Sequence, residues 1–367
     1  MTIKGNMVDA RTLESKVIDW LRFPMAAVVV LNHTGSLGGA SPYPVYSTLC
    51  IIFPEAICRL AVPLFFLISG YLFFNGLEKW NKGLYLTKLK RRAKSLLVPY
   101  IIWNILAVFF LYGYYVLRMR MHGEPFICFP EQLREWKGLR VLWDCNKGLY
   151  PLDYSLWYIR DLIVFIVFSP LILAILKKLK WIVIALLAGL FLTLDSFHFL
   201  GGLLFYSFGC YLRICGKSIL DVSRSVKWPA LAASCLLLPA IVLTYRDYRP
   251  VSNLLMRVFI LCGVFSLFCV VAGAYQKQII KDTPLLTRSS FFIFAAHGIL
   301  ILNEFAHFIV LHTLPAQGDT YYSIDLFLRP ALAIVMCIGL YWIMSKITPR
   351  TLSILTGGRT TLKATSA

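Results

Sequence analysis

One predicted helix carries three ionisable side chains on a single face. In KVIDWLRFPMAAVVVLNHTG, residues 16–35, Asp19, Arg22 and His33 fall within about 40° of one direction at 100° per residue. Histidine can act as a general base or a nucleophile, and arginine can bind an anion or stabilise developing negative charge. Arg22 and His33 are roughly 16 Å apart along such a helix. Because charge is costly in an apolar helix, the pattern indicates a functional site.

A second ionisable stripe lies towards the C-terminus. The apolar segment SSFFIFAAHGILILNEFAHFIVLH contains His297 and Glu304, which are seven residues apart and share one face of an α-helix. Histidine and carboxylate side chains in such a segment are candidates for substrate contacts. A purely structural hydrogen bond of His297 is the alternative explanation.

Other polar residues lie in the segment PEAICRLAVPLFFLISGYLFFNG. Glu55 and Arg59 are one helical turn apart, which is the spacing of a simple ion pair. Ser69 precedes Gly70, and this small pair can mark either a reactive hydroxyl or the close packing of two helices. The sequence leaves these alternatives open.

The densest basic cluster is KWNKGLYLTKLKRRAKSLLVP, which ends at Pro99 and includes Arg91, Arg92 and Lys94. A polybasic run beside a membrane span can contact anionic lipid headgroups. It can also bind the phosphates of a cytoplasmic cofactor, because arginine presents a bidentate fork to phosphate.

The composition is that of a membrane protein. Of the 367 residues, 59% are hydrophobic, whereas roughly half are apolar in a soluble domain. The net charge of +19 would suit a nucleic-acid partner, but the basic residues are spread between hydrophobic runs, which excludes that class. The ten cysteines show no CxxC and no Cys/His ligand spacing, so no metal site is predicted.

Ten apolar runs approach the roughly 20 residues that an α-helix needs to cross a bilayer. We therefore predict an all-α polytopic membrane protein with about ten transmembrane helices. The runs cover residues 17–35, 55–75, 95–117, 154–176, 179–195, 199–215, 229–245, 253–275, 289–312 and 324–347.

The distribution of lysine and arginine predicts the orientation. With the N-terminus inside, most of the 37 basic residues lie on the cytoplasmic side, so both termini are predicted to be cytoplasmic. The domains then comprise a cytoplasmic leader, the membrane domain with its outer loop, and a cytoplasmic tail. Their respective bounds are 1–16, 17–347 with the loop at 118–153, and 348–367.

The outer loop has two further features. EQLREWKGLRVLWD repeats leucine and tryptophan at helical spacing, which predicts an amphipathic helix on the outer surface. Cys128 and Cys145 can form a disulfide if the compartment is oxidising.

Five segments, in order, resemble successive signatures of the acyltransferase-3 family of membrane-bound bacterial acyltransferases. They are DWLRFPMAAVVVLNH, VPLFFLISGYLFF, KLKRRAKSLLVPYIIWN, SLWYIRDLIVF and SSFFIFAAHGIL. The resemblance covers nearly the whole chain. It implies a multi-pass protein of the bacterial inner membrane that transfers an acyl group, usually acetyl, from cytoplasmic acyl-CoA to a hydroxyl of a cell-surface or lipid-linked carbohydrate.

The resemblance also places the catalytic residues. Arg22 and His33 match the essential arginine and histidine of the family's first span, and Asp19, one turn away, would hold Arg22. His33 would serve either as the general base or as a transient acyl carrier, and the sequence leaves both routes open.

For the cofactor, the family has an Arg-x-x-Arg block before the third span. Arg92 matches its first arginine, but Ser95 stands at the second position, where Arg91 or Lys94 would substitute. The resemblance thus implies acyl-CoA as the donor. The candidates for binding the carbohydrate are Glu55, Arg59, Ser69, Trp157, His297 and Glu304.

Two other functions compete with this interpretation. Ionisable residues inside the membrane also mark transport paths, so the alternative is a transporter or flippase for a glycan or lipid-linked sugar. A non-catalytic sensor or scaffold would make the face with Arg22 and His33 dispensable. The sequence does not determine the acceptor, the choice between acetyl and succinyl, or the oligomeric state.

Overall fold

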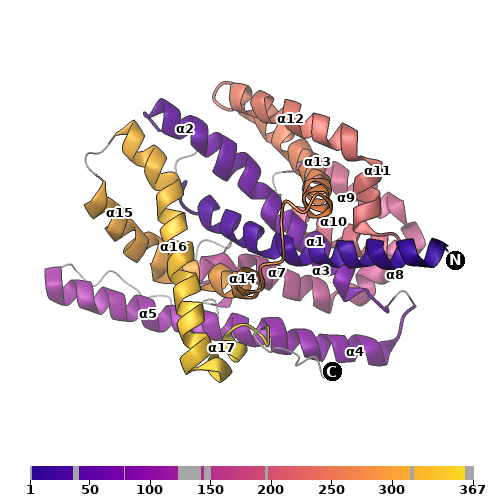
Figure 1. Cartoon of the computed structure of the whole chain (residues 1–367), viewed down its shortest axis with the longest axis horizontal. Coiled ribbons are helices and arrows are strands. Elements are labelled where there is room, and N and C mark those ends of the chain that lie inside the picture. Colours follow the sequence, from indigo (N-terminus) through magenta and orange to yellow (C-terminus); the bar gives the residue numbers. More distant parts are fainter. Residues whose placement is uncertain are drawn as a thin grey trace.

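The structure is a computed structural model that describes residues 2–35, 41–77, 79–122, 142–143, 150–194, 197–314 and 318–359. In these ranges every regular element is a helix, which confirms the all-α prediction for the described part of the chain (Figure 1). The predicted surface helix in EQLREWKGLRVLWD lies almost wholly outside these ranges. Cys128 and Cys145 lie outside them entirely.

The N-terminal half begins with the long helix α1, which starts at Thr2 and thus includes the predicted leader. Its elements are α1 (Thr2–Asn32), α2 (Pro44–Cys50), the π-helix η1 (Ile51–Ala56), the 3₁₀-helix η2 (Ile57–Leu60), α3 (Ala61–Phe73), α4 (Lys82–Arg92), the π-helix η3 (Ala93–Leu97), α5 (Val98–His122), the 3₁₀-helix η5 (Tyr154–Leu156), α7 (Trp157–Val167) and α8 (Ser169–Leu179).

The C-terminal half contains long apolar helices and ends in a short helix. Its elements are α9 (Trp181–Thr193), α10 (Phe197–Ile214), α11 (Ile219–Ser225), α12 (Lys227–Thr244), α13 (Arg249–Gln276), α14 (Pro284–Ala296), the π-helix η6 (His297–Ala306), α15 (His307–Thr313), α16 (Asp319–Ile347) and α17 (Pro349–Leu355).

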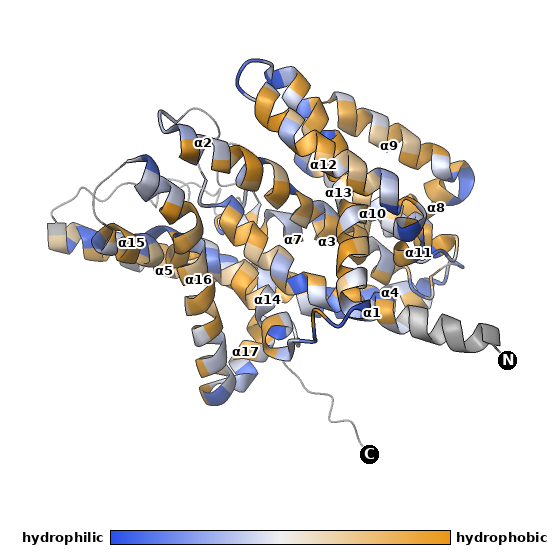
Figure 2. Cartoon of the chain, turned by 45° about the horizontal axis from the view of Figure 1, so that its top comes forward, coloured by the Kyte–Doolittle hydropathy of each residue, from blue (hydrophilic) through white to orange (hydrophobic). Residues whose placement is uncertain are grey.

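In the described residues, six helical segments are long and apolar enough to cross a membrane, and eight are if each of two bent pairs forms one span. Figure 2 shows hydrophobic residues along these helices and hydrophilic residues concentrated at their ends and connections. The two remaining predicted spans are α1 and α9. α9 has only 13 residues, about 20 Å of helix, which is shorter than the hydrocarbon layer. The count of ten and the orientation stay predictions.

Helices α3 and α10 cross with backbone in contact. A Cβ atom added to Gly70 would lie 2.2 Å from the carbonyl oxygen of Tyr206, and one added to Gly209 would lie 2.1 Å from that of Leu67. Only glycine permits this approach from both sides. The packing role considered for the Ser69-Gly70 pair is therefore confirmed at Gly70.

Helix α1 runs from the right-hand edge of Figure 1 towards the middle of the molecule and packs against α3, α13, α14 and α16. It is held there by apolar side chains that are fully buried, including Val17, Leu21 and Val30. Asp19 and Arg22 keep about half of their side-chain surface exposed. α1 thus buries one face and presents its ionisable face to open space within the bundle.

Helices α4, η3 and α5 form one continuous rod along the lower edge of Figure 1. Asn81 caps the start of α4 by accepting a hydrogen bond from the backbone N–H of Leu84 at 2.9 Å. The last described segment packs against this rod, where the indole N–H of Trp103 donates to the carbonyl of Leu355 at 3.0 Å. The described part of the predicted tail, residues 348–359, therefore packs back against α5.

Candidate active site

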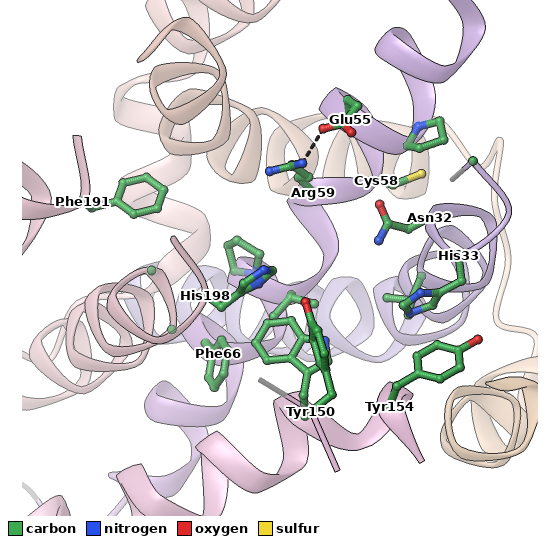
Figure 3. Close-up of a pocket in the computed structure, with 18 residues that line it drawn as sticks. Asn32, His33, Glu55, Cys58, Arg59, Phe66, Tyr150, Tyr154, Phe191 and His198 are labelled. Carbon is green, nitrogen blue, oxygen red and sulfur yellow. Dashed lines mark hydrogen bonds and ion pairs between the residues drawn. The ribbon is translucent and has the colours of Figure 1, made fainter. Parts of the chain in front are cut away.

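One cavity, of about 460 Å³, surrounds the C-terminal end of α1. We call it the histidine cavity. Figure 3 shows polar and aromatic side chains from five parts of the chain entering it. The residues with chemically useful groups include His33, Glu55, Arg59, Tyr154, Trp157 and His198.

His33 follows the last residue of α1, and its backbone N–H still donates to the carbonyl of Val30 at 3.2 Å. Its imidazole lies between two other rings. The Tyr154 ring stands edge-on with its centroid 4.8 Å away, and the His297 ring is stacked at 5.4 Å. These contacts fix the orientation of His33 at the cavity wall.

His297 begins the π-helix η6 and is completely buried. Its Nδ1 lies 3.0 Å from the carbonyl oxygen of Ile293. Because a carbonyl can only accept, Nδ1 carries the proton of the neutral ring and Nε2 is left with a lone pair. Nε2 is buried and has no hydrogen-bond partner among the described residues. Such an atom costs free energy, so its burial beside His33 requires an explanation.

Tyr154 reaches His33 because its short 3₁₀-helix, η5, is tightly anchored. Gly298 allows the approach, since a Cβ atom there would lie 3.2 Å from the tyrosine ring. On the other side, the buried carboxylate of Asp153 accepts a hydrogen bond from the Ser155 hydroxyl at 2.6 Å, and its backbone N–H donates to Asn104 at 3.2 Å. Burial raises the pKa of Asp153 to about 7.

The opposite wall of the histidine cavity combines charge with aromatic surface. Glu55 and Arg59 form the ion pair expected from their spacing, and both line the cavity (Figure 3). Trp157 packs edge-on against His198 with ring centroids 4.8 Å apart. An aromatic face beside hydrogen-bonding groups is suited to a polar, ring-shaped ligand.

A second cavity, of about 230 Å³, lies beside Arg22. We call it the arginine cavity. Its lining includes a hydroxyl pair, Ser69 and Tyr158, whose oxygens are 3.0 Å apart. It also includes four arginines and no carboxylate among the described residues, the arginines being Arg22, Arg92, Arg288 and Arg359.

The other residues predicted to bind the cofactor lie outside the arginine cavity. Arg91 and Lys94 are exposed and do not line the arginine cavity. Asp19 pairs with Arg22 at 3.1 Å, as expected, but half of its side chain is exposed, so the pair contributes little stability. Asp19 opens onto neighbouring hollows of the surface and not onto this cavity.

The same face of α1 serves both cavities. Arg22 and Ala26 line the arginine cavity, and Val29 and His33 line the histidine cavity. Their spacings of four, three and four residues keep them on one side of a helix. In the described structure the two cavities share no lining residue.

Four aromatic rings separate the cavities, and we call them the aromatic partition. Phe65, Tyr158 and Phe294 line the arginine cavity, and Phe66 lines the histidine cavity. The Tyr158 ring contacts the other three, with centroid distances of 5.8 Å to Phe65, 4.6 Å to Phe66 and 5.9 Å to Phe294.

Comparison with known proteins identifies the family of the chain. Residues 16–354 match the acyltransferase-3 family, described as an acyltransferase domain. The chain belongs to the acyltransferase-3 family. It is also 25% identical over 361 residues to the succinoglycan biosynthesis protein ExoH of Rhizobium meliloti (strain 1021), covering 94% of this chain and 93% of that protein. No solved structure matches.

Within this acyltransferase, two of the predicted carbohydrate-binding residues lie away from His33. Ser69 lines the arginine cavity. Glu304 accepts a hydrogen bond from Tyr114 of α5, so the face predicted to be shared by His297 and Glu304 is not observed. The reason is that residues 297–306 form a π-helix, whose wider turns shift a side chain seven positions on to another side.

Three residues of the acyltransferase were missed as site candidates. Tyr154 directly precedes the segment SLWYIRDLIVF, which carries the family resemblance, so its position was a usable signal. His198 stands alone between two apolar runs, a position typical of a turn residue, so the sequence does not mark it as a site residue. Arg359 lies in a polar tail and has no local signal, since only the tertiary fold brings it to the arginine cavity.

Proposed function

We propose that the protein is a membrane-bound O-acyltransferase. It moves an acyl group, acetyl in our proposal, from cytoplasmic acyl-CoA to a hydroxyl of a cell-surface or lipid-linked carbohydrate. The observation that supports this proposal most directly concerns α1. One face of this helix presents Arg22 to a cationic cavity and His33 to a separate cavity with aromatic and polar walls. The proposal includes N- and C-termini in the cytoplasm of a bacterial cell and spans across its inner membrane.

The arginine cavity is the proposed donor site. Guanidinium groups bind phosphate oxygens through charge-assisted, bidentate hydrogen bonds, and Arg22 and Arg92 stand together here. CoA carries its phosphates at one end and its thioester at the far end of an extended arm. The arm would follow Ala26 and Val29 along α1 and pass the aromatic partition towards His33, roughly 16 Å away.

The histidine cavity is the proposed acceptor site. His33 takes the proton of the acceptor hydroxyl as its oxygen attacks the thioester carbonyl carbon, so that a C–O bond forms. The C–S bond then breaks, and the CoA thiolate leaves and regains that proton as a thiol. If His33 instead carries the acyl group, its nitrogen attacks the carbonyl carbon, the C–S bond breaks, and CoA leaves as the thiol with the proton that the imidazole gives up. In a second step the hydroxyl oxygen attacks that carbon, the C–N bond breaks, and the imidazole takes the hydroxyl proton. Trapping an acyl-histidine at His33 after mixing with donor alone would identify the second route.

A carbohydrate acceptor fits the walls of this cavity. Trp157 offers an aromatic face to a sugar ring, while Glu55 and His198 offer hydrogen-bonding groups to its hydroxyls. The similarity to a protein named for succinoglycan biosynthesis supports a glycan, and it leaves succinyl as the alternative acyl group.

The test compares membranes containing wild-type protein, His33→Ala and His312→Ala. His312 is an exposed histidine outside the cavity and serves as the matched control. Acyl groups on extracted glycans are measured by mass spectrometry, and acyl-CoA consumption is followed in parallel. We expect glycan acylation and acyl-CoA consumption to be lost only with His33→Ala. Normal acylation by His33→Ala would refute the catalytic assignment, and glycan movement without acyl-CoA consumption would favour a transporter.

A further inference from the structure

The arginine cavity brings positive charges together with little compensation. Arg22 has the half-exposed Asp19 as its partner, and no carboxylate pairs with Arg92 or Arg359 among the described residues. Burial, and then the positive charges of Arg92 and Arg22, lower the pKa of Arg359 to about 10, so this guanidinium stays charged at neutral pH. Like charges gathered in this way are stabilised when an anion of several charges binds among them.

Arg359 comes from the other end of the chain and is held in a defined position. Its Nη1 donates to the carbonyl oxygens of Thr356 at 2.7 Å and of Ser95 at 3.3 Å. Its guanidinium lies over the Phe291 ring, 4.0 Å from the centroid. These contacts occupy one nitrogen and one face of the group, and in the described structure its other N–H groups have no protein partner.

Gly357 is the residue that brings this segment so close. Its φ is +64°, in the left-handed region that favours glycine. A Cβ atom there would lie 2.3 Å from the carbonyl oxygen of Ser95 and 2.7 Å from its Cα. The segment therefore packs on the backbone of η3, within the basic block, through a contact that no other residue permits.

We propose that Arg359 binds a phosphate of the nucleotide end of the donor together with Arg22 and Arg92, and that Gly357 positions it. The inference rests on the proposed donor site and adds a residue outside the basic block. It also gives a reason for Ser95 within that block: a small residue there leaves its backbone accessible to Gly357, and the C-terminal segment supplies the arginine instead.

The experiment measures CoA binding to the full-length protein purified in detergent, by calorimetric titration. Arg359→Gln is compared with Arg92→Gln as the reference and Arg350→Gln as the matched control, since Arg350 is exposed on the same tail. We expect Arg359→Gln to weaken CoA binding about tenfold or more, as loss of a hydrogen bond to a charged group does. Arg350→Gln should bind like wild type, and Arg359→Lys should recover part of the affinity.

A phosphate-free donor controls for folding. Acyl-pantetheine lacks the nucleotide end, so Arg359→Gln should use it as well as wild type does, while its KM for acyl-CoA rises. Normal CoA affinity in Arg359→Gln, alongside weak binding in Arg92→Gln, would overturn the role of Arg359 and leave the donor site standing. If wild type itself does not bind CoA, the donor site falls and this proposal falls with it. If Arg359→Gln loses as much activity with acyl-pantetheine as with acyl-CoA, Arg359 has only a structural role.

Gly357→Ala tests the positioning role, because it leaves Arg359 in the sequence. The added methyl group must move the segment off Ser95, so KM for acyl-CoA should rise several-fold while kcat at saturation and acyl-pantetheine transfer are kept. An unchanged KM would contradict the role assigned to Gly357.

Discussion

His297→Leu should separate activity from stability, because the histidine holds a buried nitrogen that the fold does not use. The buried Nε2 without a partner lowers the free energy of unfolding by about 1–3 kcal/mol through its desolvation, and the variant regains that amount. Against this, the variant loses the Nδ1 hydrogen bond, worth about 1 kcal/mol, and the ring contact with His33, worth about as much. The Ile293 carbonyl keeps a partner in the backbone N–H of His297. We expect a free energy of unfolding within about 1 kcal/mol of wild type.

Activity should respond very differently. If the reaction uses Nε2 beside His33, acyl transfer should fall about 100-fold or more, in the range seen for a group that assists proton transfer. Initial rates of acyl transfer and thermal unfolding of the same purified preparations would give both quantities.

The matched control is His307→Leu. The Nδ1 atom of His307 is also buried without a partner among the described residues, but it is His297 whose ring stacks on His33. This variant should be about as stable as wild type and retain its activity. Activity of His297→Leu within threefold of wild type would refute a role for Nε2. A parallel loss of stability and activity would assign His297 to the fold alone.

Two further predictions concern stability. Burial raises the pKa of Asp153 from 3.8 to about 7. Its contribution to the free energy of unfolding is therefore complete below pH 3.8 and is lost as the pH rises through about 7. Thermal unfolding of wild type from pH 5 to 8.5 should show this fall, and Asp153→Asn should flatten it; an equal slope in the variant would contradict the assignment. Gly209→Ala should destabilise by about 1–3 kcal/mol, because the new Cβ would lie 2.1 Å from the Leu67 carbonyl. Gly189→Ala, which meets nothing within 4 Å, is the control, and an intact Gly209→Ala protein would disprove the backbone contact.

The sequence predicted those parts of the site that follow from local periodicity. The shared face of Arg22 and His33 and the pairs Asp19–Arg22 and Glu55–Arg59 were predicted from helical spacing. α1 keeps that spacing, and the Glu55–Arg59 ion pair forms although Glu55 lies in the π-helix η1 and Arg59 in the 3₁₀-helix η2. The segments that carry the family resemblance occur along the chain in the order of the family's signatures. That order is a property of the sequence, so it identifies the family without the structure.

The remainder depends on tertiary structure. The predicted face of His297 and Glu304 is not observed, because the local helix is wider than the α-helix assumed. His198 and Arg359 reach the cavities only through the packing of α10 and of the C-terminal segment. No pattern within the tail distinguishes Arg359 from the exposed Arg350.

The aromatic partition has an electrical consequence. With the proposed orientation, the two cavities admit water from opposite sides, so the insulating thickness of the protein is reduced locally to a few rings around Tyr158. The membrane potential then falls mainly across these rings, at about 2.3 kcal/mol per elementary charge for each 100 mV. The thioester passes these rings as a neutral group and the thiol returns as one, because the proton that leaves the acceptor hydroxyl joins the thiolate beside His33. No elementary charge therefore crosses that field during transfer, and the rate of acyl transfer in energised cells should not depend on the membrane potential.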